Sequence, residues 1–431
     1  MILSNWRRGD RDLEAIEMAL RSALHRAGAS GLSELLEADS PAAEHRDLPC
    51  PCGQQARYRE LRSKAVLTVV GWVQLRRPYY LCPHCQQGQF PLDRQLDVEG
   101  LELSPGVRRM LAVVGSEVSF ARGQEQMRLL ADLEVTTKAV ERTTEGIGAE
   151  VAAQEQARIR AAHQLGLPLP AGPSLPTMYV QMDGTGVPVV PAETQGRAGR
   201  IEGQPSHTRE AKLGCVFTQT AVDQEGYALR DEASTTYTGA IETAEEFGRR
   251  IFTEALLRGW ERAQWKVVIG DGADWIWNLA DLLFPGATQI VDLYHAREHL
   301  WGLARLFWPA DPTLRKRWIQ RHLKWLERGR IARLVQALRQ VADLRPELAE
   351  TFRKEAAYFE KNAARMRYPL FRSQGLFIGS GVIEAGCRTI VGSRLKQSGM
   401  FWTVRGANAL IALRCCRLSG EFDDYWDQRA A

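Results

Sequence analysis

Hydrophobic positions along the chain change their spacing several times and so divide it into segments. Up to about residue 45 the apolar positions have loose helical spacing. The sequence from 46 to 98 favours strands instead, which are expected at Val66–Val73, interrupted by Gly71, and at Leu75–Tyr80. Helical spacing returns from about 104 to 155, and Ser104 followed by proline predicts a capped helix start. The proline-rich stretch Leu165–Thr177 is typical of a linker.

Beyond this linker, apolar runs of strand length alternate with helical patterns. Strands are expected at Met178–Val190, Lys212–Ala221, Trp265–Ile269 and Ile290–Tyr294, and helices at Thr243–Leu257 and Asp274–Leu283. Helical text rich in Arg, Lys and Trp runs from about 300 to 372, and further helices follow residue 379. The alternation predicts an α/β sheet that is interrupted by a long helical segment.

Length and charge narrow the class of protein only modestly. A chain of 431 residues is too long for one core, so two to four domains are expected. The net charge of +4 fits nucleic-acid binding without requiring it, because affinity depends on where the charge gathers. The charged N-terminal residues do not match a signal peptide, and no apolar run reaches membrane-spanning length, so a cytoplasmic protein is expected.

Four of the eight cysteines flank the β-rich segment as two pairs, Cys50 with Cys52 and Cys82 with Cys85. Zinc takes four tetrahedral ligands, and two cysteine pairs on facing turns of a small hairpin supply them. The pattern predicts a structural zinc ion, with four unrelated reduced cysteines as the alternative. Because the first pair has one intervening residue instead of two, His45 and His84 stay open as substitute ligands.

Two helices separated by a short break are expected between 119 and 144. Ser119 precedes a helix through Leu130, and Thr136 or Thr137 is placed to cap a second helix. In a helix-turn-helix the second helix enters the major groove of DNA. The positions expected to face the groove are Lys138, Glu141, Arg142 and Thr144. A plain structural helical hairpin is the alternative.

Three acidic residues stand where a carboxylate needs a partner. Asp183 lies within an otherwise apolar strand, Asp271 ends a buried strand between glycines, and Glu384 falls in the first turn of a helix. A buried carboxylate is costly unless it is paired or binds metal, and hard oxygen ligands select Mg²⁺ or Mn²⁺. Two such ions can stabilise the attacking and leaving oxygens of an in-line phosphoryl transfer. For each acid taken singly a structural alternative is strong: a strand-end turn residue for Asp183 and a helix cap for Asp271.

Several distinctive segments carry a family resemblance. They are Arg209–Gly214, Asp231–Tyr237, Gly270–Trp277, Phe284–Ala287, Ile290–Ala296, Gly379–Glu384 and Phe422–Trp426. In this order, over roughly residues 46 to 427, they resemble bacterial insertion-sequence transposases of the ISKra group. The resemblance implies a DDE catalytic core with a ribonuclease-H-like fold, in which Asp183, Asp271 and Glu384 hold Mg²⁺ or Mn²⁺. It also implies that the helical segment is an all-helical insertion into this core.

The resemblance directs attention to further residues near the acids. Asp292 and His295 match an acid-x-x-His signature, and His295 is expected either to brace the site or contact DNA, or to make a structural hydrogen bond. Beyond the glutamate, Arg388, Arg394, Lys396 and Trp402 are predicted to grip DNA ends, with Trp402 stacking on an unpaired base. In the insertion, the stripe Trp301, Trp308, Trp318, His322 and Trp325 is expected to pack in a core. The basic residues Arg353, Lys354, Lys361, Arg365, Arg367 and Arg372 line a phosphate-binding face or a solvated one.

The sequence thus predicts a transposase that cleaves double-stranded DNA at transposon ends and joins it to a target, working as a dimer or larger assembly. The expected parts are an N-terminal helical segment (1–45), a zinc ribbon (46–100), a helical DNA-binding domain (101–165), the first part of the core (176–300), the helical insertion (301–375) and the last part of the core (376–431). The alternatives are a nuclease of the same fold that does not join strands, a DNA-binding regulator derived from a transposase, and a zinc-ribbon interaction module without a role on DNA.

Overall fold

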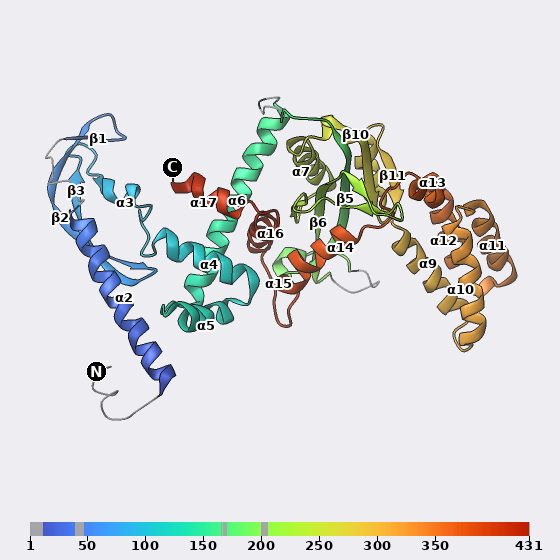
Figure 1. Ribbon diagram of the computed structural model, residues 1–431, viewed down its shortest axis with the longest axis horizontal. Helices are drawn as coiled ribbons and strands as arrows, with labels where there is room; N and C mark the ends of the chain where they lie inside the picture. Colours follow the sequence, from blue (N-terminus) through green and yellow to red (C-terminus); the bar gives the residue numbers. More distant parts are fainter. Residues whose placement is uncertain (1–11, 39–46, 165, 167–169, 200–205, 431) are drawn as a thin grey trace. The chain divides into compact units, whose positions relative to one another are not determined.

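The computed structural model describes residues 12–38, 47–164, 166, 170–199 and 206–430. Its chain divides into two compact units, one formed by Met1–Ile147 with Trp426–Ala431 and the other by Gly148–Tyr425. Figure 1 labels the helices and strands of both units.

The first unit combines a four-stranded antiparallel sheet with helices. In sheet order the strands are β1 (Leu48–Pro49), β2 (Gln55–Thr68), β3 (Gly71–Leu81) and β4 (Gly88–Gln89). The helices are α2 (Leu13–Ala38), α3 (Pro91–Gln95), α4 (Pro105–Glu117), α5 (Phe120–Ala131) and the beginning of α6 (Thr137–His163).

The long β2–β3 hairpin corrects one detail of the expected strands. Thr68 pairs with Gly71 across the turn, and the Thr68 hydroxyl donates to the Gly71 carbonyl at 2.7 Å. The chain therefore reverses before Gly71, which begins β3 with a φ of 110° that suits glycine. The expected start of α4 is confirmed, because Pro105 follows Ser104 and the Ser104 hydroxyl accepts from the Val107 N–H.

The second unit is built on a five-stranded mixed sheet. Its strand order is β11 (Thr288–Val291), β10 (Ala263–Gly270), β5 (Leu175–Pro188), β6 (Thr208–Gln219) and β9 (Thr236–Ala240). Strands β11, β10 and β5 run parallel to one another, whereas β6 is antiparallel to both of its neighbours. A small hairpin of β7 (Ala221–Val222) and β8 (Ala228–Leu229) follows β6. The α/β class predicted from the alternating pattern is confirmed.

Two groups of helices cover this sheet or extend from it (Figure 1). The helices outside the helical segment are α7 (Ala244–Leu257), α8 (Asp274–Leu283), α14 (Gly381–Cys387), α15 (Ser393–Leu395) and α16 (Val404–Leu418). Helix α17 (Phe422–Ala430) follows them, and its residues from Trp426 onward belong to the first unit. Beside β11 lies the helical segment, made of α9 (Leu293–Phe307), α10 (Pro312–Glu327), α11 (Ile331–Leu344), α12 (Ala349–Lys361) and α13 (Tyr368–Ser373).

Strand alternation decides which side chains face which helix. Gly214 of β6 leaves room for Ile251 and Phe247 of α7, because a β-carbon there would lie 2.5 Å from the Ile251 side chain. The neighbouring Cys215 turns to the opposite face, where its thiol lies 4.0 Å from the Gln181 side-chain oxygen of β5. Helices α7 and α14 therefore cover opposite faces of the sheet, since Gln181 also bonds the backbone of α14.

Several boundaries differ from the sequence expectations. The helix expected at Asp274–Leu283 is confirmed, and α7 begins after Thr243, which forms a capping box with Glu246. The strand expected to reach Tyr294 was wrong at its end, because β11 stops at Val291 and Asp292 caps α9. Strand β9 was not predicted at all, since its run of five residues is too short for a clear alternating pattern.

Candidate active site and cysteine cluster

Three aspartates lie at the same level on three adjacent parallel strands. Gln181 of β5 pairs with Ile269 of β10, so Asp183 and Asp271 each stand two residues beyond one matched pair. Strand β10 ends at Gly270, which pairs with Val291, the last residue of β11. Asp271 and Asp292 directly follow these two paired residues. The carboxyl ends of parallel strands are where sites form in α/β sheets.

Gln181 brings the distant glutamate to this edge. Its side-chain oxygen accepts from the Ile383 N–H at 3.1 Å, and its side-chain nitrogen donates to the Gly379 carbonyl at 3.2 Å. One residue after Ile383 comes Glu384, and one helical turn further Cys387 hydrogen-bonds the Asp183 carboxylate. Helix α14 is therefore held against β5, although some 200 residues separate the two elements.

Asp292 joins the sheet, α9 and the start of α14. One carboxylate oxygen accepts from the backbone N–H groups of Tyr294 and His295, which caps α9. The other oxygen accepts from the Ser380 N–H at 2.6 Å and lies against the Ser380 hydroxyl, which is also 2.8 Å from a Glu384 carboxylate oxygen. Asp292 is fully buried, so these hydrogen bonds replace its lost hydration.

Burial and mutual repulsion both act on these acids. Burial raises the pKa of Asp183, and the charge of Asp271 adds to that rise, whereas the hydrogen bond from Cys387 opposes it. Burial likewise raises the pKa of Glu384, with further contributions from the charges of Asp292 and Asp183. A cation between the carboxylates would relieve this repulsion. The structure does not bring three of these carboxylates within 4.8 Å of one another, since among the described residues only the cysteines form so tight a group.

A pair of histidines extends the site toward α12. The Nε2 atoms of His295 and His299 lie 3.1 Å apart, and His299 Nδ1 lies 2.6 Å from the Glu355 carboxylate. Tyr358 stacks on His299 with ring centroids 4.2 Å apart, and its hydroxyl donates to the Asp271 carbonyl at 2.9 Å. Sequence reasoning missed His299, Glu355 and Tyr358, because a charged helical pattern does not reveal which turns meet the sheet.

The close packing of Tyr358 beside Asp271 requires a glycine at position 272. Gly272 has a φ of 103°, and a β-carbon there would lie 2.6 Å from the Tyr358 ring. In the structure the close neighbour is a tyrosine of the protein itself.

The residues predicted to grip DNA beyond the glutamate fall into two groups. Lys396 and Arg388 are exposed, and Lys396 donates to the Thr185 hydroxyl at 2.6 Å, two residues after Asp183. Arg394 is fully buried, and Trp402 is 7% exposed with its indole N–H donating to the Leu395 carbonyl. The burial of these two side chains contradicts the predicted direct contacts with DNA. They pack on each other instead, with the Arg394 guanidinium 5.1 Å from the Trp402 ring centre.

The candidate helix-turn-helix consists of α5 and the beginning of α6. Ser119 caps α5, and the Thr136 hydroxyl accepts from the Ala139 N–H at 3.0 Å at the start of α6. Lys138 and Arg142 are exposed as expected. The expected exposure of Thr144 was wrong, because its hydroxyl is buried and donates to backbone carbonyls of Leu111 and Val140.

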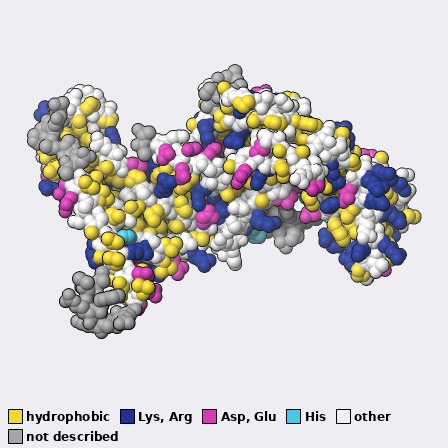
Figure 2. Space-filling model, viewed as in Figure 1, with side chains coloured by type: hydrophobic (Ala, Val, Ile, Leu, Met, Phe, Trp, Pro, Cys, Tyr) yellow, Lys and Arg dark blue, Asp and Glu magenta, His cyan; other side chains and the backbone are white. Residues whose placement is uncertain are grey.

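Positive charge gathers on the helical segment. Residues 312–373 contain sixteen Lys and Arg against six Asp and Glu, a net charge of +10, although the whole chain carries only +4. Figure 2 shows Lys and Arg side chains crowded over this part of the second unit. Between its helices, His322 lies stacked on Trp318 with centroids 3.8 Å apart, as expected for core packing. Trp301, which was expected in the same core, is 39% exposed, so the expectation was wrong for that residue.

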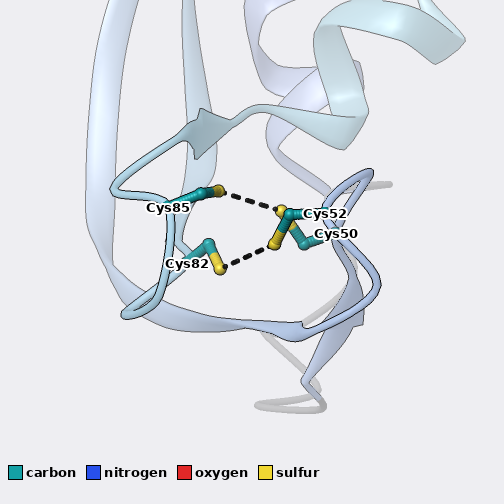
Figure 3. A group of neighbouring side chains, drawn as sticks. All are labelled: Cys50, Cys52, Cys82 and Cys85. Carbon is teal, nitrogen blue, oxygen red and sulfur yellow. Dashed lines mark hydrogen bonds between the residues drawn. The ribbon is translucent and has the colours of Figure 1, made fainter.

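The four cysteines of the first unit come together at one end of the β2–β3 hairpin (Figure 3). The sulfur atoms of Cys50 and Cys85 lie 3.5 Å apart, and those of Cys52 and Cys82 lie 3.6 Å apart. A tetrahedral zinc site with Zn–S bonds of about 2.3 Å has sulfur atoms about 3.8 Å apart, so the cluster fits this ion closely. Backbone N–H groups of Cys85 and His84 lower the pKa of Cys82 to about 6, whereas burial and the neighbouring thiols raise the pKa of Cys52 to about 12. Cys82 is therefore the first of these two thiols to form the thiolate that binds metal.

The unusual spacing of the first cysteine pair does not prevent this arrangement. The Gly53 N–H donates to the Cys50 carbonyl, and the turn brings Cys52 back toward Cys82. His84 is exposed outside the cluster, and His45 lies outside the described residues. The four cysteines therefore could hold a structural metal ion such as zinc without a histidine.

Comparison with models of known protein families found no match, and a search of characterised proteins found no relative. Within the described ranges, no helix combines the length and the apolar character needed to cross a bilayer.

Proposed function

We propose that this protein is a DNA transposase of the DDE type. The observation that carries the proposal is the placement of Asp183 and Asp271 at matched positions of adjacent parallel strands, with Glu384 on a helix tied to β5. Such a set of carboxylates at a sheet edge suits metal-dependent phosphoryl transfer. The concentration of positive charge on residues 312–373 suits a polyanionic substrate.

The sheet topology supports a ribonuclease-H-like core. Numbered in chain order, its strands lie in the order 3-2-1-4-5, with the second antiparallel to its neighbours and the first, fourth and fifth parallel. The helical segment enters after the fifth strand and ends before the helix that carries Glu384. This is the position that the family resemblance implies for an insertion, and the predicted domain boundaries remain part of the proposal.

The donor set fits divalent magnesium or manganese. Carboxylate oxygens are the ligands these ions prefer, and the raised pKa values of Asp183 and Glu384 reflect burial together with repulsion that a cation would remove. Asp183, Asp271 and Glu384 would hold the metal, with Asp292 orienting Glu384 through Ser380. Bound there, the metal supplies charge stabilisation to the attacking and leaving oxygens.

The reaction proceeds in two displacements at phosphorus. Water attacks a phosphodiester at a transposon end, the P–O3′ bond breaks, and a free 3′-hydroxyl and a 5′-phosphate result. That 3′-hydroxyl then attacks a phosphodiester of the target, forms a new P–O bond and releases another 3′-hydroxyl. No covalent intermediate with a protein side chain is required. His295, His299 and Glu355 orient the edge of the site, and the zinc and helical parts of the first unit recognise the DNA ends.

Cleavage of the DNA that flanks the coding sequence tests the proposal. With Mg²⁺ or Mn²⁺ the full chain should nick this DNA, and Asp271→Asn should reduce nicking by at least about a thousandfold while leaving DNA binding intact. Asp274→Asn is the matched control, because Asp274 lies three residues away, is exposed and pairs with Lys361. It should cleave at close to the wild-type rate.

Two other outcomes would replace the proposal. Cleavage without any strand-transfer product would indicate a nuclease of the same fold. Salt-sensitive DNA binding without cleavage, unaffected by Asp271→Asn, would indicate a DNA-binding regulator.

A further inference from the structure

A cavity of about 410 Å³ lies beside the candidate active site. Its walls come from the β7–β8 hairpin, the first turn of α9, the end of α13 and the loop that leads into α14. The residues that matter chemically are Tyr227, Tyr294, Arg372 and Phe377. Tyr227 and Tyr294 are 63% and 59% exposed, which is unusual for large aromatic rings in one cavity.

The loop that forms the floor of this cavity is fixed to the catalytic strands. The Phe377 N–H donates to the Tyr179 hydroxyl, and the Phe377 ring packs edge-on against Tyr179 and Phe217. The Gln219 side chain accepts from the Tyr179 hydroxyl and donates to the Gly375 carbonyl at 2.8 Å. The cavity is therefore held by buried contacts and does not depend on a loose surface loop.

The same loop connects the cavity to the acids. The Leu293 N–H donates to the Ile378 carbonyl at 3.0 Å, next to Asp292. Gly379 lines the cavity, and the next residue, Ser380, bonds Asp292 and Glu384. The Tyr294 ring lies directly against Gly379, where a β-carbon would approach it to 2.9 Å. A ligand in the cavity would therefore contact the same loop whose next residue, Ser380, bonds two of the acids of the candidate active site.

The hairpin wall presents its tyrosine in a defined position. Asp223 accepts from the backbone N–H groups of Glu225 and Tyr227, at 3.0 and 2.7 Å, and closes the turn between β7 and β8. Gly375 lies against Val222 of the same hairpin. Tyr227 is therefore held at the rim even though its ring is open to solvent.

We propose that this cavity binds an unpaired nucleobase of the DNA strand next to the cleaved phosphate. The inference rests on the proposed function and adds a base-binding subsite to it. Exposed aromatic rings stack on any nucleobase, because every base has a π-face. The Arg372 guanidinium at the wall supplies positive charge for the phosphate of that nucleotide. Trp402, to which the sequence assigned base stacking, is buried, whereas Tyr227 and Tyr294 are accessible.

The test uses the full chain and two short hairpin DNAs of mixed sequence, one fully paired and one with a single-stranded flap that carries 5-iodouracil. Irradiation should crosslink the flap to a peptide that contains Tyr227 or Tyr294. Tyr227→Leu should weaken binding of the flap DNA at least about fivefold and leave binding of the paired DNA unchanged. Tyr227→Phe is the matched control, because it keeps the ring and should bind like the wild type.

The possible failures are distinguishable. Crosslinks that map elsewhere, or equal weakening of both DNAs by Tyr227→Leu, overturn the base-binding subsite and leave the transposase proposal intact. Selective binding of the flap through Tyr227, combined with no metal-dependent cleavage by the wild type, overturns the transposase proposal and leaves a base-binding protein. A chain that binds neither DNA overturns both.

Discussion

At the scale of single residues, Asp292 holds together three segments that are distant in the sequence. Asp292 directly follows β11, caps α9 and accepts hydrogen bonds from the backbone N–H and the hydroxyl of Ser380. The match to an acid-x-x-His signature drew attention to this residue and to His295, which was expected to brace the site, contact DNA or make a structural hydrogen bond. In the structure the partner of Asp292 is the His295 backbone, and the His295 ring instead bonds His299.

Replacing Asp292 by asparagine should therefore destabilise the second unit. The asparagine side chain would keep one acceptor oxygen and turn the second group into a donor that faces the Ser380 N–H, so at least one buried hydrogen bond is lost. We expect Asp292→Asn to lower the free energy of unfolding by about 1–3 kcal/mol, measured by urea denaturation. Cleavage activity should fall as well, because Ser380, which contacts Glu384, loses the hydrogen bond from its N–H to Asp292.

A second aspartate cap provides the control for this prediction. Asp311 caps α10 by accepting from the Thr313 and Leu314 N–H groups, which are neighbours in the same helix. Asp311→Asn should cost less than about 1 kcal/mol, because asparagine caps helices as well as aspartate does. Equal losses for both variants would show that Asp292 is no more than a helix cap.

At the scale of elements, α10 carries a buried histidine between two tryptophan rings. His322 is 4% exposed and lies between Trp318 and Trp325, with its Nδ1 atom 2.7 Å from the Trp318 carbonyl. Burial lowers the pKa of His322 from its ordinary 6.5 to about 4, because the charged form would lose its hydration. In the folded protein α10 therefore carries His322 in its neutral form.

This shift makes the stability of the helical segment depend on pH. The unfolded chain binds a proton at His322 below about pH 6.5, and the folded chain does so only below about pH 4. The stabilising contribution is complete above pH 6.5 and is lost as the pH falls toward 4. At about 1.4 kcal/mol for each pKa unit, the loss reaches about 3 kcal/mol.

His322→Phe removes the titrating group and keeps a ring between the tryptophans. Its free energy of unfolding should be flatter than that of the wild type between pH 6.5 and 4, when both are measured by urea denaturation at several pH values. Parallel curves for the two proteins would contradict a buried neutral His322.

At the scale of the whole molecule, the two units have different sources of stability. The second unit has a large sheet with helices on both faces, whereas the cysteine cluster of the first unit has only a small surrounding core of Cys50, Ala56, Tyr80 and Cys82. Small cores of this kind commonly depend on a bound metal.

We expect a single zinc ion in each chain, and elemental analysis of the purified protein measures it. A strong chelator should speed hydrogen exchange in β2 and β3 and leave exchange in β5 and β10 unchanged. The reason is that the metal would link only residues at the end of the β2–β3 hairpin. Cys82→Ser should lose the zinc. His84→Ala should keep it, because His84 lies outside the cluster. Zinc-free wild-type protein would contradict the assignment.

Patterns confined to a few residues could be interpreted from the sequence alone. Ser104 with Pro105 and the span of α8 were correct, because capping and periodicity depend on near neighbours. The candidate acids also stood out locally, since Asp183 interrupts an apolar strand and Asp271 follows one. The cysteine pairs were visible for the same reason, although the odd spacing left the fourth ligand open until the fold brought all four sulfur atoms together.

Only the tertiary structure decided which residues meet across long separations. Tyr179, Gln181 and Asp183 face one side of β5, and in turn they contact Phe377, the start of α14 and Cys387. That alignment depends on strand register and on a chain that returns after some 200 residues. Burial is decided in the same way, which is why Trp402 packs within the fold, whereas the exposed Tyr227 is the residue we propose for base stacking. Local sequence encodes the elements and their chemistry, whereas packing determines which side chains remain available to a substrate.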